Sequence, residues 1–308
     1  SKQSIFFYNL DSNEYEEIGN SGDRTVTVDG KTSAYGNNNY VLTLTTDKDG
    51  NASTAANALS YGTYLIVEKS SPDGYIVAND ENNSVTGTMA IVNVRKEGEI
   101  VHADMYDDVS RGQLIVGKVD QERMVNYPNG SAGYKASPDS PDHPQGDASL
   151  AGAEFTIYLK SDHHVMIKDA NGKHETKKGE AALTITSDEA GIAKTIEDAL
   201  PYGSYYVVET KAPEGYLLNT EWRLDFRITK DGEVVDFTKS DGDTSYEERA
   251  ADQVIRGGVE LTKFDTDREI TKDADKNVPQ GDAVLSGAEF TIYNLSKEDI
   301  LSLEKKDW

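Results

Sequence analysis

The segment WRLDFRI, residues 222–228, alternates bulky apolar side chains with charged ones. A period of two places the apolar side chains on one face of a β-strand and the charged ones on the other. The turn-forming sequence KDGE follows at residues 230–233, and Val234 and Val235 then resume the strand pattern. We therefore predict a β-hairpin that has one buried face.

Two segments in the N-terminal third carry the same kind of signal. We predict a strand, a Glu-Gly turn and a second strand within residues 92–101, and a strand that ends in a turn within residues 40–51. No long stretch has the 3.6-residue apolar period of a helix; residues 295–308 come closest, and they suit a loop equally well. The chain is therefore predicted to be all-β, with its strands packed as sandwiches.

The chain also contains internal repeats. The sequence RGQLIVGKVD at residues 111–120 returns as RGGVELTKFD at residues 256–265. The sequences PQGDA and GAEFTIY, within residues 144–158, both recur within residues 279–293. The first repeat is displaced by 145 residues and the second by 135. We assign the difference to a longer Pro-, Ser- and Asp-rich loop around residues 128–144.

A second repeat pairs YLIVE at residues 64–68 with YYVVE at residues 205–209, and a Pro and a Gly-Tyr follow each. Together the repeats divide the chain into residues 1–111, 112–256 and 257–308. The central unit is complete, the first lacks its first strand, and the last lacks most of its body. We expect tandem β-sandwich domains in a linear array, cut from a longer protein.

The composition narrows the possible partners and chemistry. With 31 Lys and Arg against 55 Asp and Glu, the 308 residues carry a net charge of −24, which repels nucleic acids and anionic membranes. No stretch approaches the roughly 18 consecutive apolar residues of a membrane span, and the sequence after Ser1 lacks the regions of a signal peptide. The absence of cysteine excludes disulfides, thiolate nucleophiles and cysteine-ligated zinc. We predict no nucleic-acid partner and no membrane insertion of this fragment.

Three ionisable residues lie on apolar strand faces if the period of two holds. Lys118 shares its face with Leu114 and Val116, Glu209 with Tyr205 and Val207, and Asp252 with Ala250 and Val254. Taken singly, a Lys or Glu at a strand end can still reach solvent while its stem lies along the core.

The same residue types recur at matching positions of the other units. Lys263 matches Lys118, Glu68 matches Glu209, and Asp107 matches Asp252. Both Asp residues precede the lysine of the next unit by eleven residues. The recurrence favours a shared buried site over separate solvent contacts.

These residues carry a family resemblance. Residues 205–216, which contain Glu209, Thr210, Pro213 and a Gly-Tyr pair, resemble the E-box of collagen-adhesin B-type domains (Cna-B-like or SpaA-type, with an Ig-like, prealbumin-like β-sandwich). Such domains occur in Gram-positive surface adhesins and sortase-assembled pilins. Residues 117–120 and 152–155 resemble their first strands. The resemblance covers nearly the whole chain and implies stalk domains.

The resemblance also implies an intramolecular isopeptide bond between a strand lysine and an Asn or Asp of the last strand. By position, Lys118 is the nucleophile, Asp252 the acceptor and Glu209 the catalyst. Asp252 stands where many members have Asn, so its bond would release water instead of ammonia. Glu68 matches the catalyst of the N-terminal unit, and Asp107 and Lys263 would each need a partner outside this chain.

An apolar surrounding suits this reaction, because burial disfavours charge. A neutral amine can then attack a protonated carboxyl while a glutamate transfers protons. Folding supplies the proximity of the reacting groups. Closing the 134-residue separation of Lys118 and Asp252 would contribute about 4 to 5 kcal/mol, by the loop-entropy argument used for disulfides.

Other signals are weaker. Residues 47–51 (DKDGN) alternate oxygen ligands as a calcium loop does, but a hairpin turn explains them better. His163 and His164, with His174 nearby, suit an exposed loop better than a metal site. Residues 127–129 (YPN) lack the lysine of a pilin polymerisation motif, and no Leu-Pro-x-Thr-Gly sorting signal is present. We predict no cofactor and no metal.

The predicted function is a structural stalk segment of a Gram-positive cell-surface adhesin or pilus-like protein. Its location would be extracellular, with cell-wall anchoring through regions outside this fragment, and its partners would be neighbouring domains of the same protein. Bond formation would be autocatalytic and single-turnover, so the chain would not be an enzyme. The alternative is a β-sandwich module that binds a host protein or glycan. An appendage of a carbohydrate-active enzyme ranks third, because nothing marks a pair of catalytic carboxylates.

Overall fold

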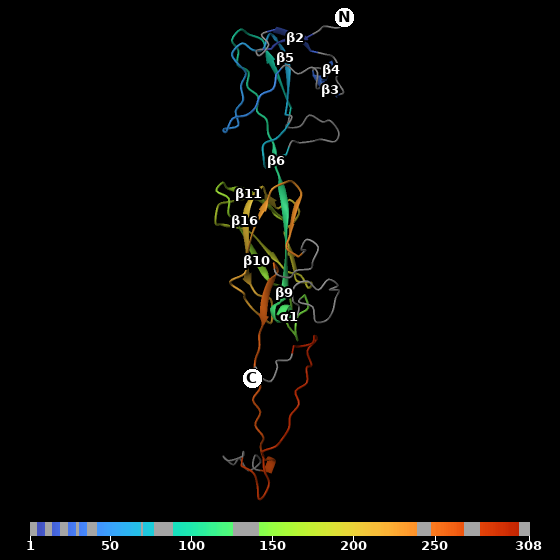
Figure 1. The fold of residues 1–308 in the computed structure, drawn as a ribbon, viewed down its shortest axis with the longest axis vertical. Coiled ribbons are helices and arrows are strands. Elements are labelled where there is room, and N and C mark those ends of the chain that lie inside the picture. The colour runs from blue at the N-terminus through green and yellow to red at the C-terminus, as the bar shows by residue number, and fades with distance from the viewer. Residues whose placement is uncertain are drawn as a thin grey trace. The chain divides into compact units, whose positions relative to one another are not determined.

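The structure is a computed structural model (Figure 1). It describes residues 5–9, 14–18, 24–28, 31–35, 42–68, 70–76, 89–125, 142–238, 248–267 and 278–301. Strands are the main regular structure of these residues, and the helix α1 (Gln121–Val125) has only five residues, which confirms the all-β prediction. Contacts within the chain define two units: unit 1 is Ser1–Lys69 with Asp80–Tyr106, and unit 2 is Ser70–Asn79 with Asp107–Trp308.

Two sheets form the sandwich of unit 2. The first is antiparallel, in the order β13 (Ala181–Thr186), β10 (Glu154–Leu159), β16 (Gly203–Lys211) and β18 (Arg223–Ile228). The second has the order β14 (Ile192–Lys194), β9 (Arg111–Asp120), β20 (Ala250–Val254) and β17 (Tyr216–Leu217). Two further strands, β15 (Leu200–Pro201) and β19 (Glu233–Asp236), also pair with β9. A hairpin of β11 (Val165–Asp169) and β12 (Gly172–Thr176) lies outside both sheets.

Side chains from both sheets fill one core. The buried apolar residues alternate along their strands and come from β9, β10, β16 and β18: Leu114, Val116, Phe155, Ile157, Tyr205, Val207, Phe226 and Ile228. The Tyr205 and Phe226 rings stack at 5.5 Å, and Trp222 meets Phe155 edge to face at 5.4 Å. Each such side chain contributes about 1.5 to 3 kcal/mol by leaving water, so the core fixes which strand faces point inward.

The WRLDFRI segment forms β18 as predicted, with Phe226 and Ile228 buried and Arg223 and Arg227 exposed. The predicted hairpin is wrong, however. Strand β18 pairs with β16, whereas β19 pairs in parallel with β9 in the other sheet, with Val235 opposite Leu114. The turn at residues 230–233 therefore crosses between sheets, because alternation shows which face is buried but not which strand is the hydrogen-bonding neighbour.

Unit 1 contains three described strand pairs. They are β1 (Ile5–Asn9) with β2 (Glu14–Ile18), β3 (Arg24–Val28) with β4 (Lys31–Tyr35), and β5 (Gly62–Val67) with β7 (Met89–Val94). The predicted strand at 92–94 lies within β7, and a turn follows at 96–99, but residues 100–101 form no strand. A shorter pair, β6 (Tyr75–Ile76) with β8 (Asp108–Val109), belongs to unit 2.

Three other local predictions have mixed outcomes. Residues 42–45 form no strand, but the turn after them is confirmed, since the Asp47 carboxylate accepts the N–H groups of Asp49 and Asn51 at 2.9 Å. Residues 295–301 form no helix, and 302–308 lie outside the described residues, as do 40–41 and most of the loop predicted at 128–144. Within the described part of the chain, no helix is long and apolar enough to cross a membrane.

Candidate functional site

Three strands bring the predicted reacting residues together. Strands β9 and β20 are parallel neighbours, with Ala250 opposite Lys118. Strand β16 lies in the facing sheet and carries Glu209 opposite Phe155. Lys118 and Asp252 therefore come from two neighbouring strands of one sheet, which are the first and last of that sheet in chain order. Glu209 reaches them from the other sheet.

The three side chains meet inside the sandwich. The Lys118 Nζ atom lies 2.8 Å from Asp252 Oδ1 and 3.1 Å from Glu209 Oε2. It also donates a hydrogen bond to the carbonyl oxygen of Ala250 at 3.1 Å. The side chains of Lys118, Glu209 and Asp252 all have 0% exposure. An ammonium group at this position therefore has three oxygen neighbours within the protein.

The burial of the site controls the protonation of Glu209. Burial raises the pKa of Glu209 to about 8; the Lys118 ammonium opposes this rise and the Asp252 carboxylate adds to it. Glu209 is therefore protonated at neutral pH. The protonated Glu209 carboxyl hydrogen-bonds the Asp252 carboxyl, which also favours the neutral acid.

One residue at the site was missed by the sequence analysis. The backbone N–H of Asn219 donates to Asp252 Oδ1 at 3.2 Å, and its side-chain amide donates to the carbonyl of Ala251 at 3.0 Å. Its own Oδ1 accepts the N–H of Glu221 at 3.1 Å, which is typical of Asn in a turn. That turn preference was the only available signal, because a backbone donor leaves no trace in residue type.

The Gly-Tyr pair that follows Glu209 supports the site from the end of the sandwich. Gly215 has φ +88°, and a Cβ atom there would lie 2.5 Å from the Cβ of Ala148, so only glycine fits. The hydroxyl of Tyr216 donates to Asp120 Oδ2 at 2.9 Å. Tyr216 thus connects the E-box segment to the end of β9, and Gly215 lets the same segment pass close to Ala148.

The matched residues of the other units are Glu68, Asp107 and Lys263. Glu68 is half-buried in unit 1, and Asp107 is half-buried in unit 2 with its Oδ1 atom buried. Lys263 is exposed, in a segment that forms no strand. The predicted roles of these three residues stay predictions.

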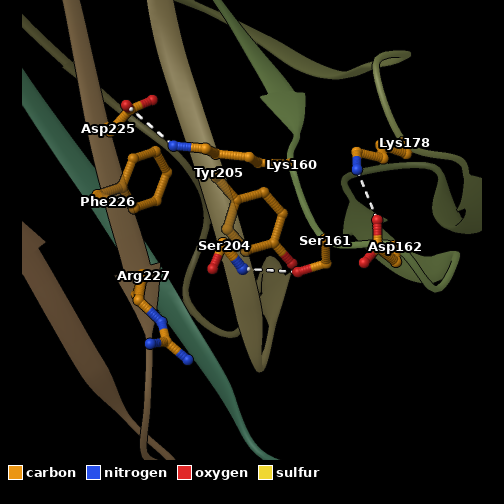
Figure 2. Close-up of a pocket in the computed structure, with 9 residues that line it drawn as sticks. All are labelled: Lys160, Ser161, Asp162, Lys178, Ser204, Tyr205, Asp225, Phe226 and Arg227. Atoms are coloured by element: carbon orange, nitrogen blue, oxygen red, sulfur yellow. Dashed lines mark hydrogen bonds and ion pairs between the residues drawn. The ribbon is translucent and has the colours of Figure 1, made fainter.

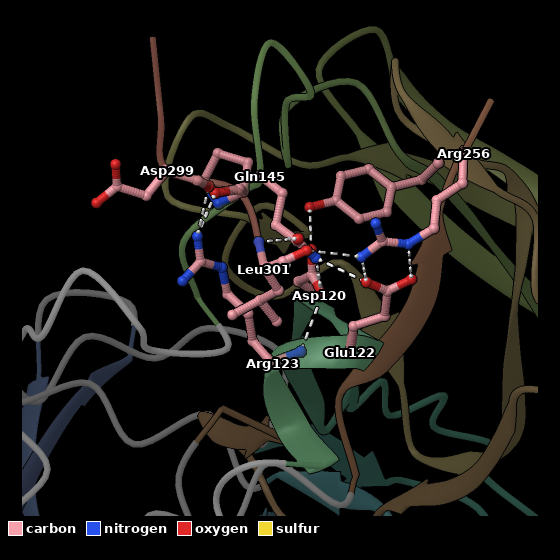
Figure 3. Close-up of polar contacts among 9 residues, drawn as sticks. Asp120, Glu122, Arg123, Gln145, Arg256, Asp299 and Leu301 are labelled. Carbon is pink, nitrogen blue, oxygen red and sulfur yellow. Dashed lines mark hydrogen bonds and ion pairs between the residues drawn. The ribbon is translucent and has the colours of Figure 1, made fainter. Parts of the chain in front are cut away.

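A second polar cluster lies at the end of β9 (Figure 3). The buried Asp120 carboxylate accepts hydrogen bonds from Gln145 Nε2 at 3.0 Å and from the Arg123 N–H at 3.1 Å. Gln145 Oε1 accepts the N–H of Leu301 at 2.9 Å, and the Arg123 guanidinium donates to the carbonyl of Asp299 at 3.1 Å. The cluster therefore binds residues 299–301 to the central domain.

Part of this cluster recurs in the C-terminal segment, where Gln280 Nε2 donates to Asp265 Oδ1 at 2.7 Å. These two residues match Gln145 and Asp120 in the repeat. The hydrogen bond is thus a shared feature of the repeated units.

An open depression of about 530 Å³ lies at the edge of the first sheet (Figure 2). Four of its charged side chains pair with one another: Lys160 with Asp225 at 3.1 Å, and Lys178 with Asp162 at 2.5 Å. The neighbouring His163 and His164 lie in an exposed loop, as predicted. Within the described residues, no group of three metal-binding side chains is found.

The two-sheet sandwich is that of a prealbumin-like β-domain. The family model for the SpaA prealbumin-like fold domain matches residues 7–99 and 143–243, more than half of the chain. The chain belongs to this family, which confirms the predicted resemblance. A comparison with curated proteins gives no significant match.

Several solved structures are similar to this chain. The TIE protein of Bacillus anthracis is 23% identical over 71% of this chain and 30% of its own, with a TM-score of 0.42. A streptococcal ancillary pilin is 25% identical over 58% of this chain and 42% of its own, with a TM-score of 0.26. The minor pilin GBS52 of Streptococcus agalactiae is 17% identical over 71% of both chains, with a TM-score of 0.27. The chain spans less than half the length of the first two.

Proposed function

We propose that the chain is a structural stalk segment of an extracellular Gram-positive surface protein, an adhesin or a pilus-like protein. In this proposal its central domain forms a covalent amide between Lys118 and Asp252. The contact of 2.8 Å between the two groups, in a fully buried site beside Glu209, carries the proposal. Family membership supports the structural role, and pilins are among the proteins of similar structure.

The reaction balances without any co-reactant. The Lys118 nitrogen bonds to Cγ of Asp252, one carboxyl oxygen leaves, and the ammonium and carboxylate charges cancel. Of the three ammonium protons, one stays on the amide nitrogen and two leave on the departing oxygen as water. Glu209, protonated at neutral pH, transfers protons and returns to its original state. Each chain reacts once, so the protein has no diffusible substrate.

The position of the bond suits a load-bearing domain. Strand β9 begins the sandwich, strand β20 ends it, and the two are parallel neighbours. Force that enters along β9 would pass through the Lys118–Asp252 amide into β20, and the intervening residues would not carry it. In a chain without cysteine, such a bond replaces a disulfide as the covalent constraint.

Intact mass spectrometry of the full chain tests the proposal. We expect a mass one water below that of the sequence, and a branched Lys118–Asp252 peptide after proteolysis. Lys118→Ala and Asp252→Ala should restore the unmodified mass. Lys160→Ala, which removes an exposed lysine paired with Asp225, is the matched control and should keep the deficit. A wild-type chain at the unmodified mass would falsify the cross-link.

The alternative function, a module that binds a host protein or glycan, has its best candidate site in the depression of Figure 2. Its charged residues Lys160, Asp225, Lys178 and Asp162 already pair with each other, so binding would first have to break these contacts. The stalk role is therefore favoured, and a glycan array with the full chain should show no specific binding.

A further inference from the structure

We propose that the backbone N–H of Asn219 stabilises the negative charge that develops on Asp252 during cross-linking, and that it decides which carboxyl oxygen leaves. Oδ1 is retained as the oxygen of the new amide, and Oδ2 departs as water. This inference rests on the proposed Lys118–Asp252 bond.

The two oxygens of Asp252 have different surroundings. Oδ1 lies 2.8 Å from Lys118 Nζ and accepts the N–H of Asn219 at 3.2 Å. Oδ2 is buried and, among the described residues, accepts no N–H group. When the amine attacks Cγ, negative charge builds up on the carboxyl oxygens, and a fixed donor in a dry site stabilises the oxygen at which it already points. That oxygen is Oδ1.

Glu209 can supply the proton that the leaving oxygen needs, because its carboxyl hydrogen-bonds that of Asp252. The Oε1 atom of Glu209 is buried, as Oδ2 of Asp252 is. Glu209 holds a proton at neutral pH because burial raises its pKa. In the balanced step, the Nζ–Cγ bond forms and the Cγ–Oδ2 bond breaks. Two protons reach Oδ2 with the help of Glu209, and water leaves.

The side chain of Asn219 positions its own backbone. Its amide donates to the carbonyl of Ala251, the residue directly before Asp252, at 3.0 Å, and its Oδ1 accepts the N–H of Glu221 at 3.1 Å. These bonds hold the turn against β20 and keep the N–H directed at Asp252. The backbone N–H is thus a catalytic group, whereas the side chain is a positioning group.

The first test replaces only the N–H. The full chain is made by cell-free translation with the α-hydroxy analogue of asparagine at position 219, which gives an ester without a donor. The same ester change at Leu218 is the matched control. After translation is stopped, intact mass is followed over time. Loss of one such donor typically slows a reaction about 10²- to 10³-fold, and we expect a slowing of this order at 219 but not at Leu218.

A variant with a shortened side chain separates positioning from folding. Asn219→Ala keeps the N–H and loses the bond to Ala251, so we expect a slowing of about tenfold, equivalent to about 1.4 kcal/mol. Its pH profile should match that of the wild type, because Glu209 is untouched. A profile shifted in pH would show that the substitution disturbs the whole trio and would overturn the positioning role.

The second test uses the cross-linked wild-type chain. If Oδ1 is retained, the Asn219 N–H still bonds to the amide oxygen, and NMR should detect a scalar coupling across that bond between the Asn219 nitrogen and Asp252 Cγ. A missing coupling, or an ester variant at 219 that folds and reacts at the wild-type rate, overturns the inference. A wild-type chain with no mass deficit refutes the cross-link itself, so the two failures are distinguishable.

Discussion

Replacing Glu209 by Gln should separate the cross-linking chemistry from the packing of the site. Gln has the shape of Glu and can still accept a hydrogen bond from Lys118, which lies 3.1 Å from Glu209 Oε2. It cannot transfer a proton. The buried Lys118–Asp252 pair therefore stays, and the sandwich should fold around an unreacted site.

The expected effects follow from this separation. Loss of a general acid–base group slows a reaction by about 10²- to 10⁴-fold, so intact mass should show mostly unmodified chain shortly after synthesis. The unreacted domain also lacks the closed loop, worth about 4 to 5 kcal/mol. For a domain of this size, that loss corresponds to a melting temperature lower by roughly 10 °C or more, measurable by calorimetry.

Glu154→Gln is the matched control, because Glu154 pairs with Lys211 at 2.9 Å on the exposed side of β10. Exposed ion pairs of this kind contribute about 0 to 1 kcal/mol, so this variant should keep both the mass deficit and nearly all of its stability. If Glu209→Gln lost water as fast as the wild type does, proton transfer would have to come from another group, and the proposed role of Glu209 would be refuted.

Three further predictions concern the protonation, the acceptor and the second polar cluster. Because the pKa of Glu209 is raised to about 8, its neutral acid is present below that pH, and mass time courses should show cross-linking slowing as the pH rises past 8. Asp252→Asn should release ammonia, detectable by an enzymatic assay, and give a product of the same mass as the cross-linked wild type; release of water would contradict the scheme. Gln145→Ala removes a hydrogen bond to the buried Asp120 carboxylate, so it should lower the free energy of unfolding by about 1 to 3 kcal/mol and speed hydrogen exchange at the Leu301 amide. Unchanged exchange would show that the contact between Gln145 and Leu301 is not maintained in solution.

The candidate site was predictable because it depends on side-chain direction. A period of two and two sets of repeats were enough to place Lys118, Glu209 and Asp252 on inward faces. In the structure, the Lys118 Nζ atom lies within 3.1 Å of a carboxyl oxygen of each of the other two residues. A one-residue error in register would have turned any of them outward. The repeats reduced the chance that such an error would go unnoticed, since each of the three residues has a match of the same type in another unit.

Other features could not be read in this way, because they depend on hydrogen bonds between distant backbone groups. The pairing of β19 with β9 instead of β18 is one example. The Asn219 N–H and the contact of Gln145 with Leu301 are two more. Each involves a main-chain donor or strand edge, which almost any residue type can supply. Alternation reports burial, and it carries no information about such partners.

The burial of the trio explains both why the bond would form and why it would last. Before reaction, the fold must keep an ammonium and a carboxylate out of water, which is costly even for a well-placed pair. Amide formation removes both charges, so the reaction removes the desolvation cost that folding imposes on them. The same dry surroundings that keep Glu209 protonated also leave no bulk water beside the product, since the side chains have 0% exposure. Hydrolysis would require water to re-enter a packed core and charges to reappear there, so bond formation should be irreversible as long as the domain stays folded.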